Sequence, residues 1–274
     1  MAAPASLMGE VRRRVSAAAT HKTLLRSGSD LGMWLGCGYP KSGTVWLCRL
    51  MSSALEIPYP QNYEMPIRMS SVIHGHWDYD ARFPKTIYVH RDGRDVLVSL
   101  YYYLVSSGRP LQNPLGMAMR KLRGHDVRSI AEAGDRSEQM MRLFEMETER
   151  PTAAHVSWAE HVRQWRGHSN VAVVSYEDLL AQPVRTLGEA FESLGHPVGE
   201  RLLRASVEVH DFSARTGREP GQSAPQSFRR SGTSGGWREH FSPELARAFD
   251  AYAGDLLVEL GYEKDRSWVD KISR

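Results

Sequence analysis

Short apolar runs alternate with longer stretches of helical periodicity along this chain of 274 residues. The runs are apolar or rich in β-branched residues, and they predict strands at residues 33–35, 86–90 and 171–176. Apolar positions at helical spacing predict helices over residues 45–55, 92–104, 183–195 and 243–260. This alternation predicts an α/β fold in which helices cover both faces of a central parallel sheet.

Three segments depart from the alternation. Residues 1–30 are small and basic, which predicts a leader or a short helix ahead of a single domain at 31–274. Residues 105–150 carry proline and glycine and then Met, Arg and Glu, and we interpret them as a helical lid over the substrate. Residues 211–238 are rich in Gly, Ser and Arg, and a loop of this length inside a domain is usually functional.

Composition narrows the classes of function. Hydrophobic residues make up 41% of the chain, charged residues 24%, and the formal net charge is only +3. This charge is too small for a protein coated with nucleic acid, whereas local clusters of arginine favour an anionic small ligand. The sequence has no secretory signal. None of its apolar stretches approaches the length of about 18 residues that a membrane-spanning helix requires. We therefore expect a cytoplasmic protein without a nucleic-acid or membrane partner, with Cys37 and Cys48 as buried thiols.

The turn between the first strand and the first helix has the composition of a phosphate-binding loop. Residues 36–44 include three glycines that allow close backbone approach, hydroxyls at Ser42 and Thr44, and the charge of Lys41. A helix N-terminus adds backbone N–H groups and the positive end of a dipole. The ATP-binding loop requires Gly-Lys-Ser/Thr, whereas here Lys41 precedes Gly43 and Thr44.

The eight residues 39–46, Tyr-Pro-Lys-Ser-Gly-Thr-Val-Trp, resemble the 5′-phosphosulfate loop of the sulfotransferases that use 3′-phosphoadenosine 5′-phosphosulfate (PAPS). The resemblance is to the cytosolic type of this domain, as in bacterial enzymes that act on small molecules. It implies a three-layer P-loop-type fold, PAPS as donor and adenosine 3′,5′-bisphosphate (PAP) as product. The family commonly has a second threonine where this chain has Val45, so one side-chain donor is missing. The residues of this loop that the resemblance assigns to the donor are Lys41, Ser42, Gly43, Thr44, Val45 and Trp46.

Residues 91–99 resemble the family motif that holds the 3′-phosphate of the donor. The resemblance assigns that phosphate to Arg91 and to Ser99 eight residues later, and a guanidinium binds phosphate through two parallel N–H···O bonds. In a P-loop kinase the second strand ends in an aspartate that holds magnesium, whereas here it ends in His90 and Arg91. The carboxylates Asp92 and Asp95 are better explained as helix-start residues. We therefore predict no metal ion.

Residues 228–238 resemble a second 3′-phosphate segment of the family, within the predicted donor-binding loop 211–238. Aligned on Trp237, this segment assigns phosphate contacts to Arg230 and Gly232, with Ser231 in place of the usual lysine. Gly236 replaces an aspartate, which makes the match weaker. For the adenine ring the resemblance implies Trp46, Tyr176 and, more loosely, Phe212, although each of the three is equally compatible with a core position.

Transfer to a hydroxyl requires a base, and the segment Val72-Ile73-His74-Gly75-His76 offers two histidines. His74 is favoured because it directly follows the apolar pair where the family places its histidine, and His76 is the alternative. A zinc site is the other interpretation of His-x-His, but no further ligands stand at recognisable spacing. The expected catalytic groups are then His74 as base, Lys41 on the leaving oxygen and Ser99 with Arg91 on the 3′-phosphate.

The sequence thus predicts transfer of a sulfuryl group from PAPS to a hydroxyl of a small molecule. Two other functions stay open: a P-loop kinase for a nucleotide or small molecule, and a non-catalytic protein that binds PAP. Residues 57–70 and 101–150, where the acceptor would be recognised, contain no motif that identifies it. The oligomeric state is left open between a monomer and a homodimer.

Overall fold

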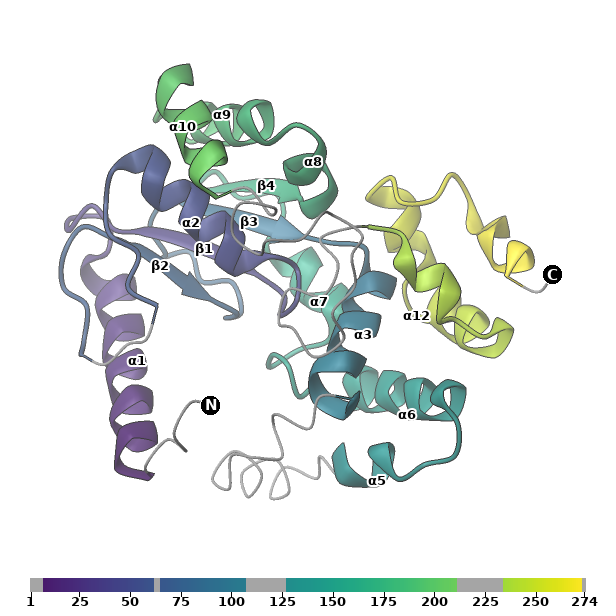
Figure 1. The fold of residues 1–274 in the computed structure, drawn as a ribbon. Helices are drawn as coiled ribbons and strands as arrows, with labels where there is room; N and C mark the ends of the chain where they lie inside the picture. The colour runs from purple at the N-terminus through teal and green to yellow at the C-terminus, as the bar shows by residue number, and fades with distance from the viewer. Residues whose placement is uncertain (1–6, 62–64, 107–126, 211–233, 273–274) are drawn as a thin grey trace. The chain divides into compact units, whose positions relative to one another are not determined.

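The computed structural model describes residues 7–61, 65–106, 127–210 and 234–272. The chain divides into two compact units, Met1–His90 with His161–Gly217 and Arg91–Glu160 with Arg218–Arg274. Figure 1 labels the helices and strands of both units. No helix in the described ranges combines the length and the apolar character needed to cross a bilayer.

The first unit contains the sheet. In the described part of the chain, four parallel strands lie in the order β2-β1-β3-β4 (Figure 1). Their bounds are β1 Trp34–Gly38, β2 Val72–Gly75, β3 Thr86–His90 and β4 Val171–Ser175. The parallel sheet predicted from the apolar runs is confirmed. The first strand extends further than predicted, to Gly38, because it is paired on both sides by β2 and β3.

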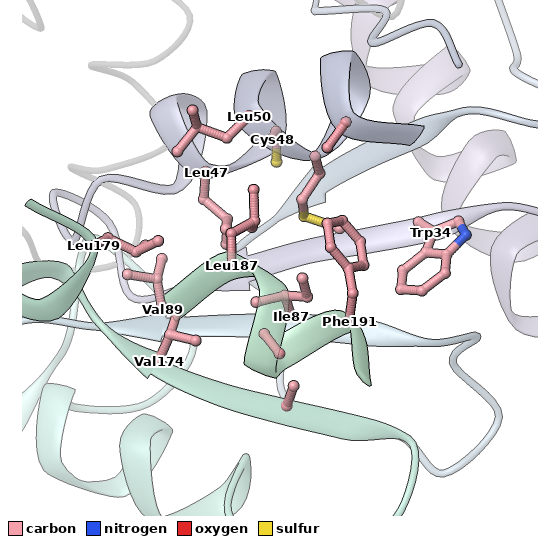
Figure 2. Close-up of a cluster of buried hydrophobic side chains, with 14 of the residues drawn as sticks. Trp34, Leu47, Cys48, Leu50, Ile87, Val89, Val174, Leu179, Leu187 and Phe191 are labelled. Carbon is pink, nitrogen blue, oxygen red and sulfur yellow. The ribbon is translucent and has the colours of Figure 1, made fainter. Parts of the chain in front are cut away.

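The helices of the first unit are α1 (Leu7–Ser27), α2 (Thr44–Leu55), α8 (Tyr176–Ala181), α9 (Pro183–Ser193) and α10 (Glu200–Val209), and α7 (Trp158–Gln164) enters it at His161. Side chains of α2, α9 and α10 form a mainly aliphatic core, which also includes Trp34 and Phe191, on one face of the sheet. Figure 2 shows part of this core. Ile87 and Val89 of β3 belong to this core together with Leu47 and Phe191. The basic segment 1–30, expected as a leader or short helix, forms the 21-residue helix α1 in its described part.

The opposite face of the sheet carries an aromatic cluster. Side chains alternate between the two faces of a strand, so Tyr88 points away from the aliphatic core. The ring of Tyr88 stacks on that of Trp165 at a centroid distance of 5.4 Å, and the ring of Phe83 also stacks on Trp165, at 5.6 Å. His21 of α1 lies 5.7 Å from the Phe83 ring. The two faces of the sheet are therefore covered by different kinds of side chain.

The second unit is helical in its described part. It contains α3 (Gly93–Tyr101), the π-helix η1 (Tyr102–Ser106), α5 (Val127–Ala131), α6 (Arg136–Glu149), η3 (Gly236–Glu239), α12 (Pro243–Glu259) and η4 (Arg266–Lys271). Asp92 caps α3 by accepting the N–H of Arg94, as the sequence predicted. The helix predicted over 92–104 changes to π geometry after Tyr101, where α3 ends and η1 begins.

The domain boundaries proposed from the sequence stay predictions. The proposed lid at 105–150 is helical at 127–131 and 136–149, and its residues 107–126 lie outside the described ranges. Of the predicted donor-binding loop 211–238, only residues 234–238 are described.

Candidate functional site

The loop that contains Lys41 joins β1 to α2 and has an unusual backbone. Lys41 has φ +76° and Gly43 has φ +94°, and the left-handed region is uncommon for a residue with a side chain. Strain of this kind persists where the surrounding structure enforces it, and it is concentrated at functional sites. Gly43 is the N-cap of α2 and has no side chain with which to cap it. Gly43 therefore supplies no side-chain acceptor to the positive end of the α2 dipole.

Two hydroxyls in this loop are buried without a hydrogen-bond partner among the described residues. The side chains of Ser42 and Thr44 are 0% and 3% exposed, and neither Ser42 Oγ nor Thr44 Oγ1 has a partner there. A buried polar group left in this condition costs about 1–3 kcal/mol. An anion with several acceptor oxygens, next to the charge of Lys41, would satisfy both. The loop therefore fits a phosphate or sulfate group.

Two aromatic residues predicted to hold adenine lie beside this loop. The ring of Trp46 on α2 meets that of Tyr176 at the start of α8, edge to face at 5.9 Å. A Cβ added at Gly43 would lie 2.7 Å from Cδ2 of Tyr176, so only glycine fits against this ring. The structure thus brings Tyr176 to the loop, although the two are far apart in the sequence. Both rings also touch the aliphatic core, so their positions serve packing as well.

His210, which the sequence did not single out, is bound to the same region. Its backbone carbonyl accepts the indole N–H of Trp46 at 3.2 Å, and its Nε2 lies 2.8 Å from Ser53 Oγ. His210 ends α10 and directly precedes the predicted donor-binding loop. Its position before that loop was the one available signal.

The two candidate bases lie at the end of β2 and differ in their contacts. His74 meets the ring of Tyr59 edge to face at 5.8 Å, and burial together with the charge of His76 lowers its pKa to about 4. Nδ1 of His76 lies 2.6 Å from the carbonyl oxygen of Gly38. A carbonyl only accepts hydrogen bonds, so Nδ1 carries the proton and Nε2 is the unprotonated nitrogen.

Electrostatics connect His76 to the phosphate loop. Burial lowers the pKa of His76, the hydrogen bond to Gly38 opposes this, and the positive charge of Lys41 lowers the pKa further. Lys41 therefore lies within electrostatic reach of His76. A lowered pKa keeps each of the two histidines neutral at pH 7, which is the state that a general base requires.

A buried pair of a histidine and a tyrosine in the first unit was also absent from the predictions made from the sequence. His161 is fully buried, and its Nδ1 lies 2.8 Å from the hydroxyl of Tyr88. Burial is the main cause that lowers the pKa of His161 to about 3, and the charge of His76 contributes. No local pattern marks His161, because its neighbours come from segments distant in the sequence.

In the second unit, the residues predicted to hold the 3′-phosphate lie before and on α3. The side chain of Arg91 is 11% exposed, and its Nη2 lies 3.8 Å from Asp95 Oδ2. Ser99 is half-buried on α3. Phe212, Arg230, Ser231 and Gly232 lie outside the described residues, so the structure leaves their predicted contacts untested.

No three His, Cys, Asp or Glu side chains come together as a metal-binding group within the described ranges. The absence of a metal ion from the reaction stays a prediction from the sequence. Cys37 and Cys48 are buried free thiols, as expected.

Comparison with known proteins identifies one family. Residues 81–261 match the sulfotransferase domain family. Mouse sulfotransferase 2B1 is 28% identical over 258 residues, covering 78% of this chain and 68% of the mouse protein. The 3-alpha-hydroxysteroid sulfotransferase of Cavia porcellus is 26% identical over 251 residues, covering 77% of this chain and 79% of that protein. The matches to the rat and human 2B1 proteins span 52% and 62% of their lengths.

Solved structures with the same fold extend over most of the chain. Mouse sulfotransferase SULT7A1 complexed with PAP has a TM-score of 0.61 at 18% identity, covering 93% of this chain and 95% of that one. Retinol dehydratase in complex with androsterone and inactive cofactor PAP has a TM-score of 0.56 at 17% identity, and the match covers 88% of this chain and 85% of that one. These matches confirm the predicted P-loop-type fold, with a central parallel sheet flanked by helices.

Proposed function

Because the chain belongs to the PAPS-dependent sulfotransferase family, we propose that it transfers the sulfuryl group of PAPS to a hydroxyl of a small-molecule acceptor. The observation that carries the proposal is the pair of buried hydroxyls of Ser42 and Thr44, which have no partner among the described residues. The phosphosulfate of the donor supplies acceptor oxygens for both. The PAP bound to two structural relatives supports the same choice of donor.

Each group of the loop contributes differently to donor binding. The ammonium of Lys41 and the uncapped N-terminus of α2 attract the negative charge of the phosphosulfate. Ser42 and Thr44 donate hydrogen bonds that fix its orientation. Trp46 and Tyr176 offer aromatic surface to adenine beside the loop. The family resemblance implies that Val45 contacts the phosphosulfate through its backbone, and that Gly43 allows the backbone to approach the donor closely.

For the base, we propose a histidine of the pair at the end of β2, and two observations favour His76. Its Nδ1–H donates to Gly38, which leaves Nε2 to accept a proton. The charge of Lys41 also reaches His76 and lowers its pKa, whereas the pKa of His74 is lowered by burial and by His76. His74, favoured from the sequence alone, is the alternative.

The reaction follows from these roles. Nε2 of the histidine takes the proton of the acceptor hydroxyl, the hydroxyl oxygen forms a bond to sulfur, and the bond from sulfur to the bridging oxygen breaks. The electron pair stays on that oxygen, where the charge of Lys41 stabilises it. Holding the reactants in line supplies much of the rate enhancement.

The remaining donor contacts rest on the family resemblance. We propose Arg91 and Ser99 as ligands of the 3′-phosphate, which fix the register of the donor. Arg230, Ser231 and Gly232 are proposed for the same phosphate, and Phe212 for adenine. A cytoplasmic location and a homodimer stay predictions.

The experiment measures transfer from radiolabelled PAPS to a panel of phenols, sterols, nucleosides and glycosides. The sterols are included because two relatives are named as hydroxysteroid sulfotransferases. We expect Lys41→Ala to lower turnover at least a hundredfold, and His76→Gln to lower it by about 10²–10⁴. His74→Gln is the matched control and is expected to have the smaller effect.

Thermal shift with PAP separates binding from chemistry, since a ligand that binds the folded state raises the melting temperature. Both histidine variants are expected to keep the shift. Unchanged turnover in Lys41→Ala would contradict the proposed function. Stabilisation by ATP with magnesium, but not by PAP, would favour the kinase instead.

A further inference from the structure

Asp95 is a buried carboxylate in the first turn of α3 that binds a distant segment of the second unit. Its side chain is 1% exposed. Oδ2 accepts the backbone N–H of Gly235 at 2.7 Å, and Oδ1 accepts the N–H of Trp237 at 3.0 Å. The hydroxyl of Ser234 also lies 3.4 Å from Oδ2. Both oxygens are therefore used to hold the backbone of residues 234–237, far along the chain from α3.

The same carboxylate faces a residue of the proposed donor site. Asp95 Oδ2, the oxygen that accepts from Gly235, lies 3.8 Å from Arg91 Nη2. This is the distance of an ion pair and is too long for a hydrogen bond. Asp95 therefore restricts the orientation of the Arg91 guanidinium through charge attraction. The carboxylate lies between one proposed ligand of the 3′-phosphate and the segment 234–237.

Charge balance supports this arrangement. Burial raises the pKa of Asp95, and the charge of Arg91 and the N–H groups of Gly235 and Trp237 oppose that rise. A buried carboxylate is tolerated only when it is paired and hydrogen-bonded. Asp95 thus depends on Arg91 and on the segment 234–237 together. A change in either one alters the environment of the other through this single side chain.

Trp237 has a second support that does not involve Arg91. The guanidinium of Arg94 stacks on its ring at 3.8 Å and on Trp268 at 4.6 Å. Arg94 is also paired with Asp92 at 2.7 Å and with Glu263 at 2.6 Å. The packing of Trp237 can therefore be weakened from the Arg94 side, which provides a control for the role of Asp95.

We propose that Asp95 is a positioning residue for recognition of the 3′-phosphate of the donor. It orients the Arg91 guanidinium and anchors the backbone of 234–237, which follows the proposed phosphate residues 230–232 in the sequence. Asp95 itself does not touch the donor. The inference rests on the proposed function, and it goes beyond the helix-start role that the sequence indicates for this aspartate.

The test compares two ligands that differ only in the 3′-phosphate, PAP and adenosine 5′-phosphate, by titration calorimetry on the full chain. Asp95→Asn keeps the shape of the side chain but removes its charge and replaces one acceptor oxygen by a donor. We expect Asp95→Asn to lower the affinity for PAP by about tenfold, which is the scale of one charge-assisted contact. The affinity for adenosine 5′-phosphate is expected to change by less than about twofold. In turnover, KM for PAPS is expected to rise while kcat changes little.

Glu263→Gln is the matched control, because it removes a charge partner of Arg94 and leaves Arg91 and Asp95 in place. It is expected to lower the melting temperature without changing the ratio of the two affinities. Should Asp95→Asn fail to fold, Asp95→Glu, which keeps the charge but moves the carboxylate by one methylene, is expected to reduce the same ratio.

The outcomes separate the two proposals. A wild-type protein that binds PAP no more tightly than adenosine 5′-phosphate overturns the assignment of the 3′-phosphate, and with it the premise of this inference. A wild-type protein that prefers PAP, together with Asp95 variants that keep this preference, overturns the role of Asp95 alone. Equal weakening of both ligands also overturns it, since that is the effect of a purely structural residue.

Discussion

The strongest test of the phosphate loop is Gly43→Ala, because two independent features of the structure oppose a side chain there. Gly43 has φ +94°, and its added Cβ would lie 2.7 Å from Cδ2 and 3.0 Å from Cε2 of Tyr176. The left-handed backbone costs an alanine about 1 kcal/mol. Overpacking against a ring in a filled region adds about 1–3 kcal/mol. The free energy of unfolding should therefore fall by about 2–4 kcal/mol.

Gly167→Ala separates the two contributions. Gly167 has a similar φ of +82°, but nothing lies within 4 Å of its added Cβ. The free energy of unfolding of Gly167→Ala should therefore fall only by the backbone contribution of about 1 kcal/mol. Urea titrations of both variants at pH 7, with a common slope, give the difference directly. PAP binding measured by thermal shift should weaken in Gly43→Ala, where the ring of Tyr176 is displaced, and stay unchanged in Gly167→Ala.

Equal losses of stability in the two variants would refute the reasoning, since they would mean that the ring of Tyr176 moves away without cost. Unchanged affinity of Gly43→Ala for PAP would separately contradict the placement of Tyr176 in the donor site. A larger loss of stability in Gly167→Ala than in Gly43→Ala would contradict the close contact between residue 43 and the ring of Tyr176.

Two further predictions concern buried polar groups. Thr44→Val removes a hydroxyl that has no partner among the described residues, so urea titration should show the ligand-free protein stabilised by about 1 kcal/mol. Calorimetry should show PAP bound about tenfold more weakly, and a variant that loses stability would contradict the unpaired state of this hydroxyl. His90 and His161 have pKa values lowered to about 4 and about 3, mainly by burial. Between these values and about 6.5 the unfolded chain binds more protons, so stability falls as pH falls, by about 2 kcal/mol for each histidine at pH 5. Urea titrations at pH 7 and 5 should show this loss of stability, and stability should depend less steeply on pH in His161→Asn. An unchanged pH dependence in that variant would exclude His161 as a source of the loss.

The neutral state of these histidines also bears on the proposed chemistry. His74 and His76 have lowered pKa values for the same main reason, burial. A group that is already unprotonated at neutral pH can act as a base without first losing a proton to water. The burial that costs stability in acid thus keeps the base in its active form over a wide range of pH.

Much of the fold was determined by local sequence patterns. The strand predicted at 86–90 is β3 with the same bounds. A short run of apolar and β-branched residues is typical of a strand that is buried on both faces of a parallel sheet. The turn around Lys41 was also predictable, since glycine, hydroxyl and lysine residues between a strand and a helix are typical of a loop that binds an anion. The start of α3 at Asp92 followed from a capping preference that depends on adjacent residues alone.

The tertiary structure alone decided how these elements meet. Asp95 was interpreted from its sequence position as a helix-start residue, yet its oxygens hold Gly235 and Trp237. The hydrogen bond of His76 to Gly38 and that of Trp46 to His210 are likewise absent from any local pattern. The physical reason is that strand and helix preferences depend on near neighbours, whereas burial and hydrogen bonding depend on which distant segments pack together. The sequence by itself predicted which residues would hold the donor, and the tertiary structure decided which of the described ones are buried, paired and neutral.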